Sequence, residues 1–143
     1  MSKLVYNKIA AKLQRLDEYV RYLTELQKIS QKDFISLHYH YGLAERYLQL
    51  SIEILLDIGK LIVLSEGFEK PEDNQEIFSI LRIHKILSIV LISRISGIAG
   101  FRNVLVHDYE KIDREIIFEK LKNNLDDFIL FKKEILKYLH KKY

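Results

Sequence analysis

The sequence predicts an all-α fold, an up-and-down bundle of four long helices with the third helix broken by a kink. The 143 residues include one Pro and five Gly, too few for the many turns of a β-fold. Apolar residues recur every three or four positions over long stretches, the period of an amphipathic helix. No stretch of useful length alternates apolar and polar residues as a half-buried strand does. We expect one domain over residues 1–143.

The first two helices are predicted over about residues 2–29 and from residue 33 or so to about residue 65. Ser30 or Asp33 is expected to cap the second helix, because both side chains can accept a backbone hydrogen bond. The inward face of the first helix is predicted from spacings of four, three, four and three residues between Ile9, Leu13, Leu16, Val20 and Leu23.

The second helix carries a polar ladder at i, i+4 spacing: Glu45, Gln49, Glu53 and Asp57. These four side chains share one face, and the three carboxylates repel each other unless a cation or polar group lies opposite. Two interpretations remain open. The ladder is a solvated face, or part of it meets an Arg from elsewhere in the fold.

The third segment follows a loop over residues 66–74, which holds the only Pro. A short helix over about 74–84 is predicted, then a kink at residues 84–88, then a helix over 89–106 that is apolar almost all round and therefore central. Gly97 and Gly100 are expected to let another backbone approach closely, either within the chain or from a second subunit.

The fourth helix is predicted over residues 114–141. Asp113 is a good N-cap, and Ile112 with Ile117 fits a hydrophobic staple. The residues expected to face inward are Ile117, Leu121, Leu125, Phe128, Ile135 and Leu139.

Composition excludes several classes of site and location. The absence of Cys excludes disulfides and thiolate metal sites, and a reducing cytoplasm is the simplest setting. The N-terminal residues lack the apolar core of a signal peptide, and the most apolar run is interrupted by Arg94, so we expect no membrane contact. A net charge of +3 permits nucleic acid as a partner without arguing for it.

One cluster of polar side chains stands out, at the end of the apolar run. Residues 101–109 contain Arg102, Asn103, His107 and Tyr109. Arg102 and His107 are five residues apart, about 140° around a helix, so the helix must unwind near Val106 if they are to converge. Asn103 and His107 are four apart, and the amide can orient the imidazole along the helix side.

An Arg and a His without metal ligands suffice for cleaving RNA, whose 2′-hydroxyl is a built-in nucleophile. His can transfer a proton near neutrality, and Arg can steady the charge that builds on phosphate. One His cannot readily act as both acid and base, whereas a symmetric dimer would supply two. The alternative is structural: Arg102 and His107 satisfy carbonyls at a helix end.

Other candidate sites are weaker. His38 and His40 lie two residues apart, the wrong spacing for two metal ligands on one helical face, and are interpreted as packing residues. The sequence has neither a Gly-rich phosphate loop nor a nucleophilic Cys or Ser elbow. We therefore predict neither a metal nor a cofactor.

The Arg-x4-His-x-Tyr pattern of Arg102, His107 and Tyr109, after an apolar helix in an all-helical chain, resembles HEPN-domain toxins of the HepT type. The segment 39–63, with Glu45-Arg46-Tyr47-Leu48-Gln49, resembles that family's second helix. The resemblance implies a homodimeric, metal-independent ribonuclease toxin with Arg102 and His107 catalytic. It also implies an MNT-type nucleotidyltransferase antitoxin that adds AMP to Tyr109.

Two alternatives differ in class from a nuclease. One is a non-catalytic helical module that binds a nucleotide or a nucleotidyltransferase through the same groove. The other is a purely structural dimerisation bundle, in which neither Arg102 nor His107 affects any activity.

Overall fold

The computed structural model describes residues 1–107 and 113–142, and of residues 106 and 107 it describes the backbone alone. Within these ranges every regular element is a helix, which confirms the all-α prediction. The helices are α1 (Lys3–Gln27), α2 (Gln31–Ser36), α3 (His38–Glu66), α4 (Asn74–Ile83), α5 (Ile89–Arg94), α6 (Ile98–His107), α7 (Arg114–Asn123) and α8 (Leu125–Lys142). None of these helices is long and apolar enough to cross a bilayer.

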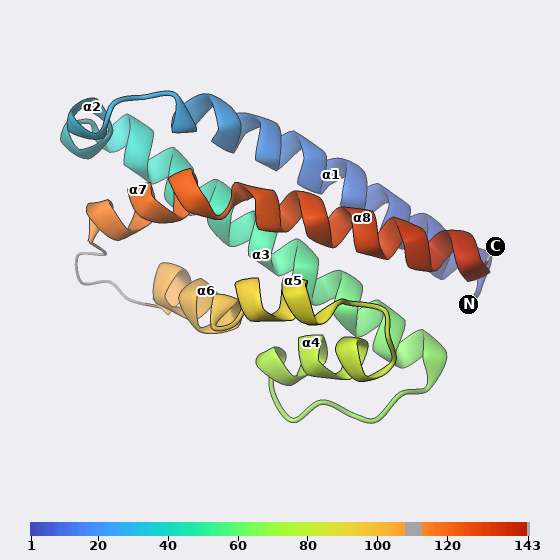
Figure 1. The fold of residues 1–143 in the computed structure, drawn as a ribbon. Helices are drawn as coiled ribbons and strands as arrows, with labels where there is room; N and C mark the ends of the chain where they lie inside the picture. Colours follow the sequence, from blue (N-terminus) through green and yellow to red (C-terminus); the bar gives the residue numbers. More distant parts are fainter. Residues whose placement is uncertain (108–112, 143) are drawn as a thin grey trace.

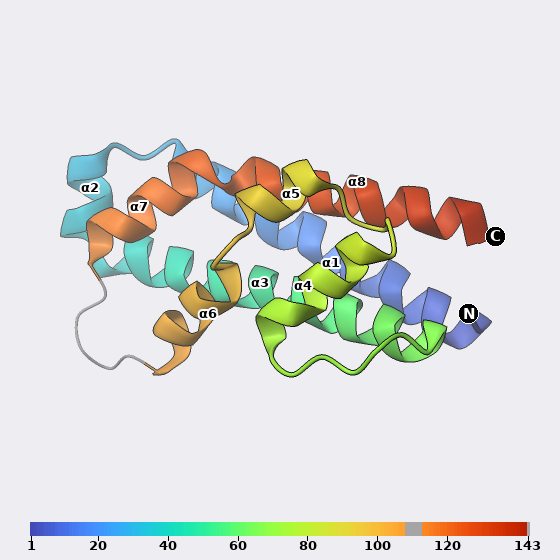
Figure 2. The ribbon, with the colours of Figure 1, turned by 60° about the horizontal axis from the view of Figure 1, so that its bottom comes forward.

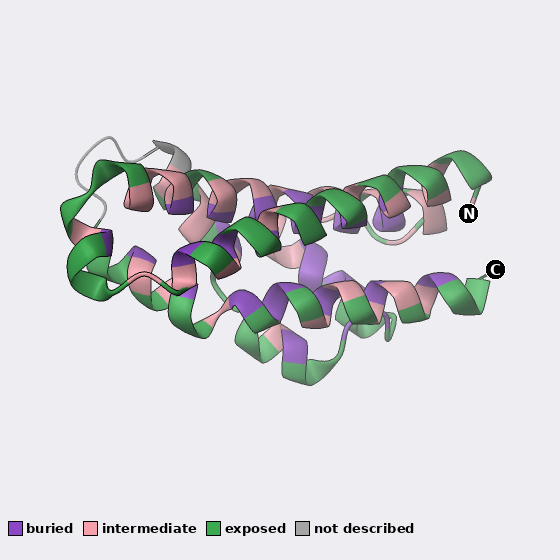
Figure 3. Cartoon of the chain, turned by 90° about the horizontal axis from the view of Figure 1, so that it is seen from above, coloured by how far each residue is buried: buried purple, intermediate pink, exposed green. Residues whose placement is uncertain are grey.

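The long helices α1, α3 and α8 run alongside one another (Figures 1 and 2), α4 and α6 pack on α3, and α5 packs against α4 and α8. The start of α1 and the end of α8 lie at the same end of the molecule (Figure 1). The central helix is α3, which packs against α1, α2, α4, α6, α7 and α8. Buried residues form stripes along the inward faces of the helices (Figure 3).

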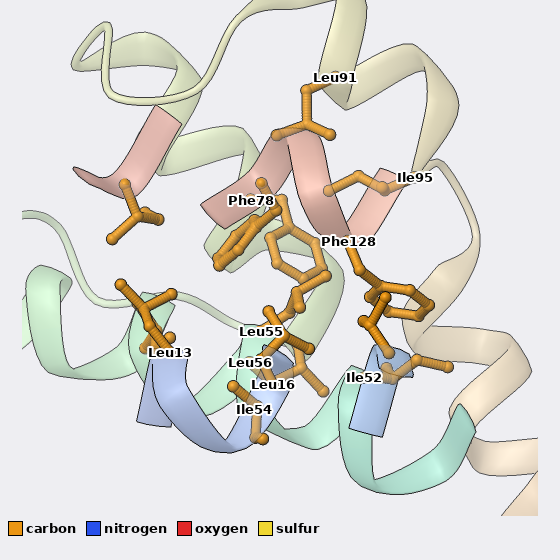
Figure 4. Close-up of a cluster of buried hydrophobic side chains, with 14 of the residues drawn as sticks. Leu13, Leu16, Ile52, Ile54, Leu55, Leu56, Phe78, Leu91, Ile95 and Phe128 are labelled. Atoms are coloured by element: carbon orange, nitrogen blue, oxygen red, sulfur yellow. The ribbon is translucent and has the colours of Figure 1, made fainter. Parts of the chain in front are cut away.

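Residues from five helices meet in the core. All the residues predicted to face inward from the first and last helices are buried. Figure 4 shows side chains from α1, α3, α4, α5 and α8 converging, among them Leu16, Leu55, Phe78, Leu91 and Phe128. Burial of these apolar side chains stabilises the fold, and the residues lie where the helical period predicts.

The second predicted helix is in fact two. Ser30 caps α2, its hydroxyl accepting a hydrogen bond from the Asp33 amide at 3.3 Å, as predicted. Leu37 then adopts an extended conformation and separates α2 from α3. This break turns Phe34 of α2 into the core, where it is fully buried.

The helix predicted over residues 89–106 is wrong in two respects. It is broken into α5 and α6 at Gly97, whose φ of 82° favours glycine. It is also not central, because Ile89 and Val90 are 66% and 62% exposed. The predicted kink at residues 84–88 is confirmed, with Lys85 at a φ of 62°.

The expected close approach at Gly97 and Gly100 is not found among the residues that the structure describes. A Cβ at either position would meet no described atom within 4 Å. The close approach occurs instead at Gly59 of α3, where a Cβ would lie 2.4 Å from Cγ2 of Ile77 on α4. Gly59 therefore sets how closely these two helices pack.

The last predicted helix divides at Asn124 into α7 and α8. Asp113 caps α7 as predicted, accepting from the Glu115 amide at 2.9 Å, while Ile112 of the predicted staple lies outside the described residues. At the joint, Asp127 is 1% exposed and accepts hydrogen bonds from Arg94 Nε at 2.5 Å and Asn124 Nδ2 at 2.9 Å. This ion pair ties the end of α5 to the start of α8.

Candidate active site

Arg102 extends from α6 to the polar ladder on α3. Its Nη2 lies 3.0 Å from Oε1 of Glu53, and the two side chains are 25% and 30% exposed. Gln49 Nε2 donates to the same carboxylate oxygen at 3.2 Å. Of the two interpretations of the ladder, the one in which it meets an Arg is confirmed for Glu53.

The guanidinium of Arg102 has hydrogen-bonding capacity left over. Its Nη1 donates to the side-chain oxygen of Asn103 at 3.3 Å. Its Nε is buried and has no acceptor among the described residues. A buried N–H without a partner costs about 1–3 kcal/mol, and the Arg102 side chain as a whole is 25% exposed.

Asn103 was predicted to orient His107. Its side-chain oxygen accepts a hydrogen bond from Arg102, and the side chain is exposed. The Asn103 amide therefore helps to hold the guanidinium. Its predicted contact with the imidazole lies outside the described side chains.

His107 is the last residue of α6, so the helix stays regular past Val106, where unwinding was expected. On such a helix the positions of Arg102 and His107 stand about 140° apart around the axis. The His107 side chain and all of Tyr109 lie outside the described residues. Their predicted roles stay predictions.

The other carboxylates of the ladder meet different helices. Asp57 pairs with Lys12 of α1 at 3.4 Å. Glu45 is partly buried, and this burial raises the pKa of its carboxyl, while the positive charges of His38 and Arg114 act in the opposite direction. The carboxylates on one face of α3 thus interact with charged groups of α1, α6 and the start of α7.

Arg114 forms a second well-held cation at the start of α7. Its Nη1 donates to the carbonyl oxygen of Ile35 at 3.0 Å, and its guanidinium carbon lies 4.1 Å from the centroid of the Tyr41 ring. Sequence reasoning missed this residue and did not identify Glu53 as the partner of Arg102. The signal for Glu53 was present in the ladder, because stacked carboxylates need cations from elsewhere.

The paired histidines, predicted to be packing residues, contact tyrosines of the same helix, and His38 is exposed. The ring of His38 meets Tyr41 edge-on at 5.1 Å, and His40 lies 5.9 Å from Tyr39. Among the described residues no group of three or more His, Cys, Asp or Glu is arranged to hold a metal ion.

Comparison with known proteins places this arrangement in a family. Residues 9–135 match the protein family described as Ribonuclease HepT-like. The chain belongs to this family. It is therefore a ribonuclease, and both the predicted activity and the predicted resemblance to HepT-type HEPN toxins are confirmed.

Two characterised relatives are nucleases in name. The chain is 30% identical over 131 residues to the tRNA nuclease HepT of Aphanizomenon flos-aquae (strain 2012/KM1/D3), covering 92% of this chain and 89% of that protein. It is 26% identical over 84 residues to the mRNA nuclease HepT of Shewanella oneidensis, covering 59% of this chain and 63% of that protein.

Solved structures share the fold at low sequence identity. The tri-AMPylated Shewanella oneidensis HEPN toxin, solved in complex with MNT antitoxin, superposes with a TM-score of 0.77 at 22% identity, covering 96% of this chain and 99% of that chain. A toxin–antitoxin structure with AMP-PNP gives a TM-score of 0.82 at 19% identity, covering 90% and 97%. The HepT-like ribonuclease described here therefore has the helical fold of these toxins.

Proposed function

We propose that this HepT-like ribonuclease is the toxin of a two-component toxin–antitoxin pair, a metal-independent endoribonuclease of the cytoplasm. The observation that carries the proposal is Arg102, whose guanidinium is held by Glu53 and Asn103 while its side chain stays 25% exposed. A phosphate oxygen is the acceptor that suits such a group.

In the proposed reaction the 2′-oxygen of a ribose attacks the adjacent phosphorus. The bond from phosphorus to the 5′-oxygen breaks, leaving a 2′,3′-cyclic phosphate and a 5′-hydroxyl. A base takes the 2′-hydroxyl proton and an acid protonates the leaving oxygen. His107 fills these proton-transfer roles, and Arg102 neutralises charge on the phosphate oxygens in the transition state.

Two imidazoles are needed if one takes a proton while another gives one. We infer a symmetric homodimer of single-domain chains, residues 1–143, that brings a His107 and an Arg102 from each subunit into one cleft. The position of His107 on the same regular helix as Arg102, about 140° around the axis, supports this arrangement. Groups that diverge on one helix can converge across a twofold axis.

Control of the activity is assigned to Tyr109. The partner would be an MNT-type nucleotidyltransferase: the Tyr109 oxygen attacks the α-phosphorus of ATP, loses its proton and expels pyrophosphate. The product carries bulk and negative charge beside the place where substrate phosphate binds. The AMPylated state of the Shewanella toxin in complex with its antitoxin supports this mode of neutralisation.

The test is cleavage of RNA by the purified protein in EDTA. We expect His107→Ala and Arg102→Ala each to abolish cleavage, while His140→Ala, which removes an exposed histidine of α8, does not affect it. Circular dichroism should show the same helix content in all three variants. Undiminished cleavage by His107→Ala would refute the catalytic assignment.

The same set of variants separates the rival function. A non-catalytic binding module would show no RNA turnover in the wild type, yet lose affinity for a nucleotide or for the nucleotidyltransferase in Arg102→Ala. Intact-mass measurement after incubation with the partner and ATP should show AMP-sized additions that are missing in Tyr109→Phe.

A further inference from the structure

A stripe of cations followed by tyrosines runs along α1. Lys8, Lys12 and Arg15 are spaced four and three apart, and Tyr19 and Tyr22 continue the same spacing. Residues at this spacing lie on one side of a helix. Tyr19 and Tyr22 both pack on Tyr47 of α3, with ring centroids 5.7 and 5.0 Å apart.

Beside the cations, a groove of about 690 Å³ lies between α1 and α3. The α3 side contributes apolar side chains, among them Leu61 and the 82% exposed Leu64. The groove is bordered by four cations, Lys8, Lys12, Arg15 and Lys60, and by one carboxylate, Asp57. This balance gives the groove a positive potential.

The groove lies next to the candidate active site. Asp57 borders it, and Glu53, the partner of Arg102, is one turn earlier on α3, a rise of about 6 Å. Lys12 of α1 pairs with Asp57, and Arg102 of α6 pairs with Glu53, so cations from two helices lie along one stretch of α3.

We propose that this α1–α3 groove binds the single-stranded backbone of the RNA that flanks the scissile phosphate. This inference rests on the proposed function. Lys8 and Arg15 are seven residues apart, about 10 Å along the helix, so the cations of this stripe can contact neighbouring phosphates of one strand. The apolar wall of the groove, and the tyrosines that follow the cations on α1, offer surfaces on which riboses and bases can pack, as in single-strand binding proteins.

An acidic face of a protein partner also has charge complementary to the groove. RNA is favoured because the groove adjoins the arginine proposed to hold the scissile phosphate, so one strand can contact both. The cations then anchor the strand without reading its sequence.

The test uses a 5′-fluorescein-labelled 20-nucleotide 2′-O-methyl RNA, which lacks the nucleophilic hydroxyl and is therefore not cut. Fluorescence anisotropy measures its dissociation constant from 0.1 to 1 M salt. The variant Lys8→Gln/Lys60→Gln removes two exposed cations of the groove. Each lost phosphate contact should lower the slope of log K against log salt by ~0.7, so two lower it by ~1.4 and weaken binding about 25-fold at 0.1 M salt.

The matched control removes two lysines from another basic cavity. Lys137 and Lys141 of α8 line a cavity of about 970 Å³ against the turn between α4 and α5. We expect Lys137→Gln/Lys141→Gln, with the same change of net charge, to retain most of the affinity. Thermal unfolding should verify that both double variants remain folded.

Three results would overturn the inference. An unchanged salt slope in the groove variant is the first, and an equal loss in both double variants, which would reflect net charge alone, is the second. The third is unaltered RNA affinity with lost binding of the nucleotidyltransferase, which would make the groove a protein interface. Because binding to uncut RNA is measured, absence of cleavage would contradict the proposed function without deciding this inference.

Discussion

The Arg102–Glu53 pair allows a sharp test of how the site is organised. We predict that Glu53→Gln lowers the rate of RNA cleavage by holding the guanidinium less firmly. The substitution keeps the size of the side chain and removes the negative charge. A hydrogen bond to a charged group contributes about 1.5–3 kcal/mol and a neutral one about 1 kcal/mol.

The expected magnitude follows from the exposure of the pair. Because 25% of the Arg102 side chain and 30% of the Glu53 side chain are exposed, solvent screening places the effect at the low end of this difference, about 0.5 kcal/mol. If the whole difference appears in the transition state, the cleavage rate falls about twofold. Unfolding stability should fall by about 0.5 kcal/mol, lowering Tm by about 1–2 °C.

The control is Asp57→Asn on the next turn of the ladder. It removes the same charge four residues away, from a carboxylate that pairs with Lys12 and not with Arg102. Single-turnover cleavage of an end-labelled RNA in EDTA, at saturating enzyme, compares the two variants, so that an effect of Asp57 on RNA binding in the groove does not enter the measured rate. Equal rates for Glu53→Gln and Asp57→Asn would show that the charge of the ladder matters and the orientation of Arg102 does not.

Three further predictions concern stability. Burial raises the pKa of the Glu45 carboxyl, so around that pKa the folded state binds more protons than the unfolded state. The free energy of unfolding should therefore fall as pH rises from below the ordinary value of 4.5. Over the same rise, urea unfolding should show Glu45→Gln gaining stability relative to the wild type. Arg94→Met should lower the free energy of unfolding by about 3 kcal/mol, because it leaves Asp127 buried without its cation. Asp127→Asn should cost less, because the 45% exposed Arg94 can turn to solvent. Similar losses of stability in the two variants would contradict this asymmetry. Gly59→Ala should cost about 1–3 kcal/mol of stability because its Cβ would overlap Ile77. Gly100→Ala, where a Cβ meets open space, should be neutral or stabilising by up to about 1 kcal/mol. Melting temperatures of the two variants test this difference.

Where local chemistry determines structure, the sequence was a good guide. The heptad-like stripe of α1, with Ile9 and Leu16, is buried because helical period and core burial demand the same spacing. Ser30 and Asp113 cap α2 and α7 because their side chains satisfy amides that a helix start leaves unpaired. These features depend on neighbours a few residues away.

The breaks inside apolar runs could not be predicted in the same way. Gly97 lies in a stretch that could be helical throughout, and only packing decides that it adopts a φ of 82°. Leu37 carries no breaking signal at all, yet it separates α2 from α3. Asn124 did carry a signal, since Asn is favoured near helix ends, and it marks the joint between α7 and α8.

The candidate site shows the same division. The spacing of Arg102, Asn103 and His107 identified which residues to consider, but the partner of Arg102 is 49 residues away in sequence. The ladder on α3 predicted that a cation is needed without saying which one. Only the packing of α6 against α3 selects Arg102 for Glu53.

That packing gives the polar face of α3 a specific part in the proposed chemistry. Glu53 fixes a guanidinium from α6, and Asp57, one turn on, fixes Lys12 of α1 at the edge of the basic groove. Both contacts start from one continuous helix, whose hydrogen-bonded backbone keeps a constant rise of about 1.5 Å per residue. The separation between the proposed scissile-phosphate contact and the proposed flanking-phosphate contact is therefore set by α3. Substrate strands that match this separation make both contacts at once. A face of carboxylates can thus organise a site for an anion, because each carboxylate holds a cation that contacts the phosphate.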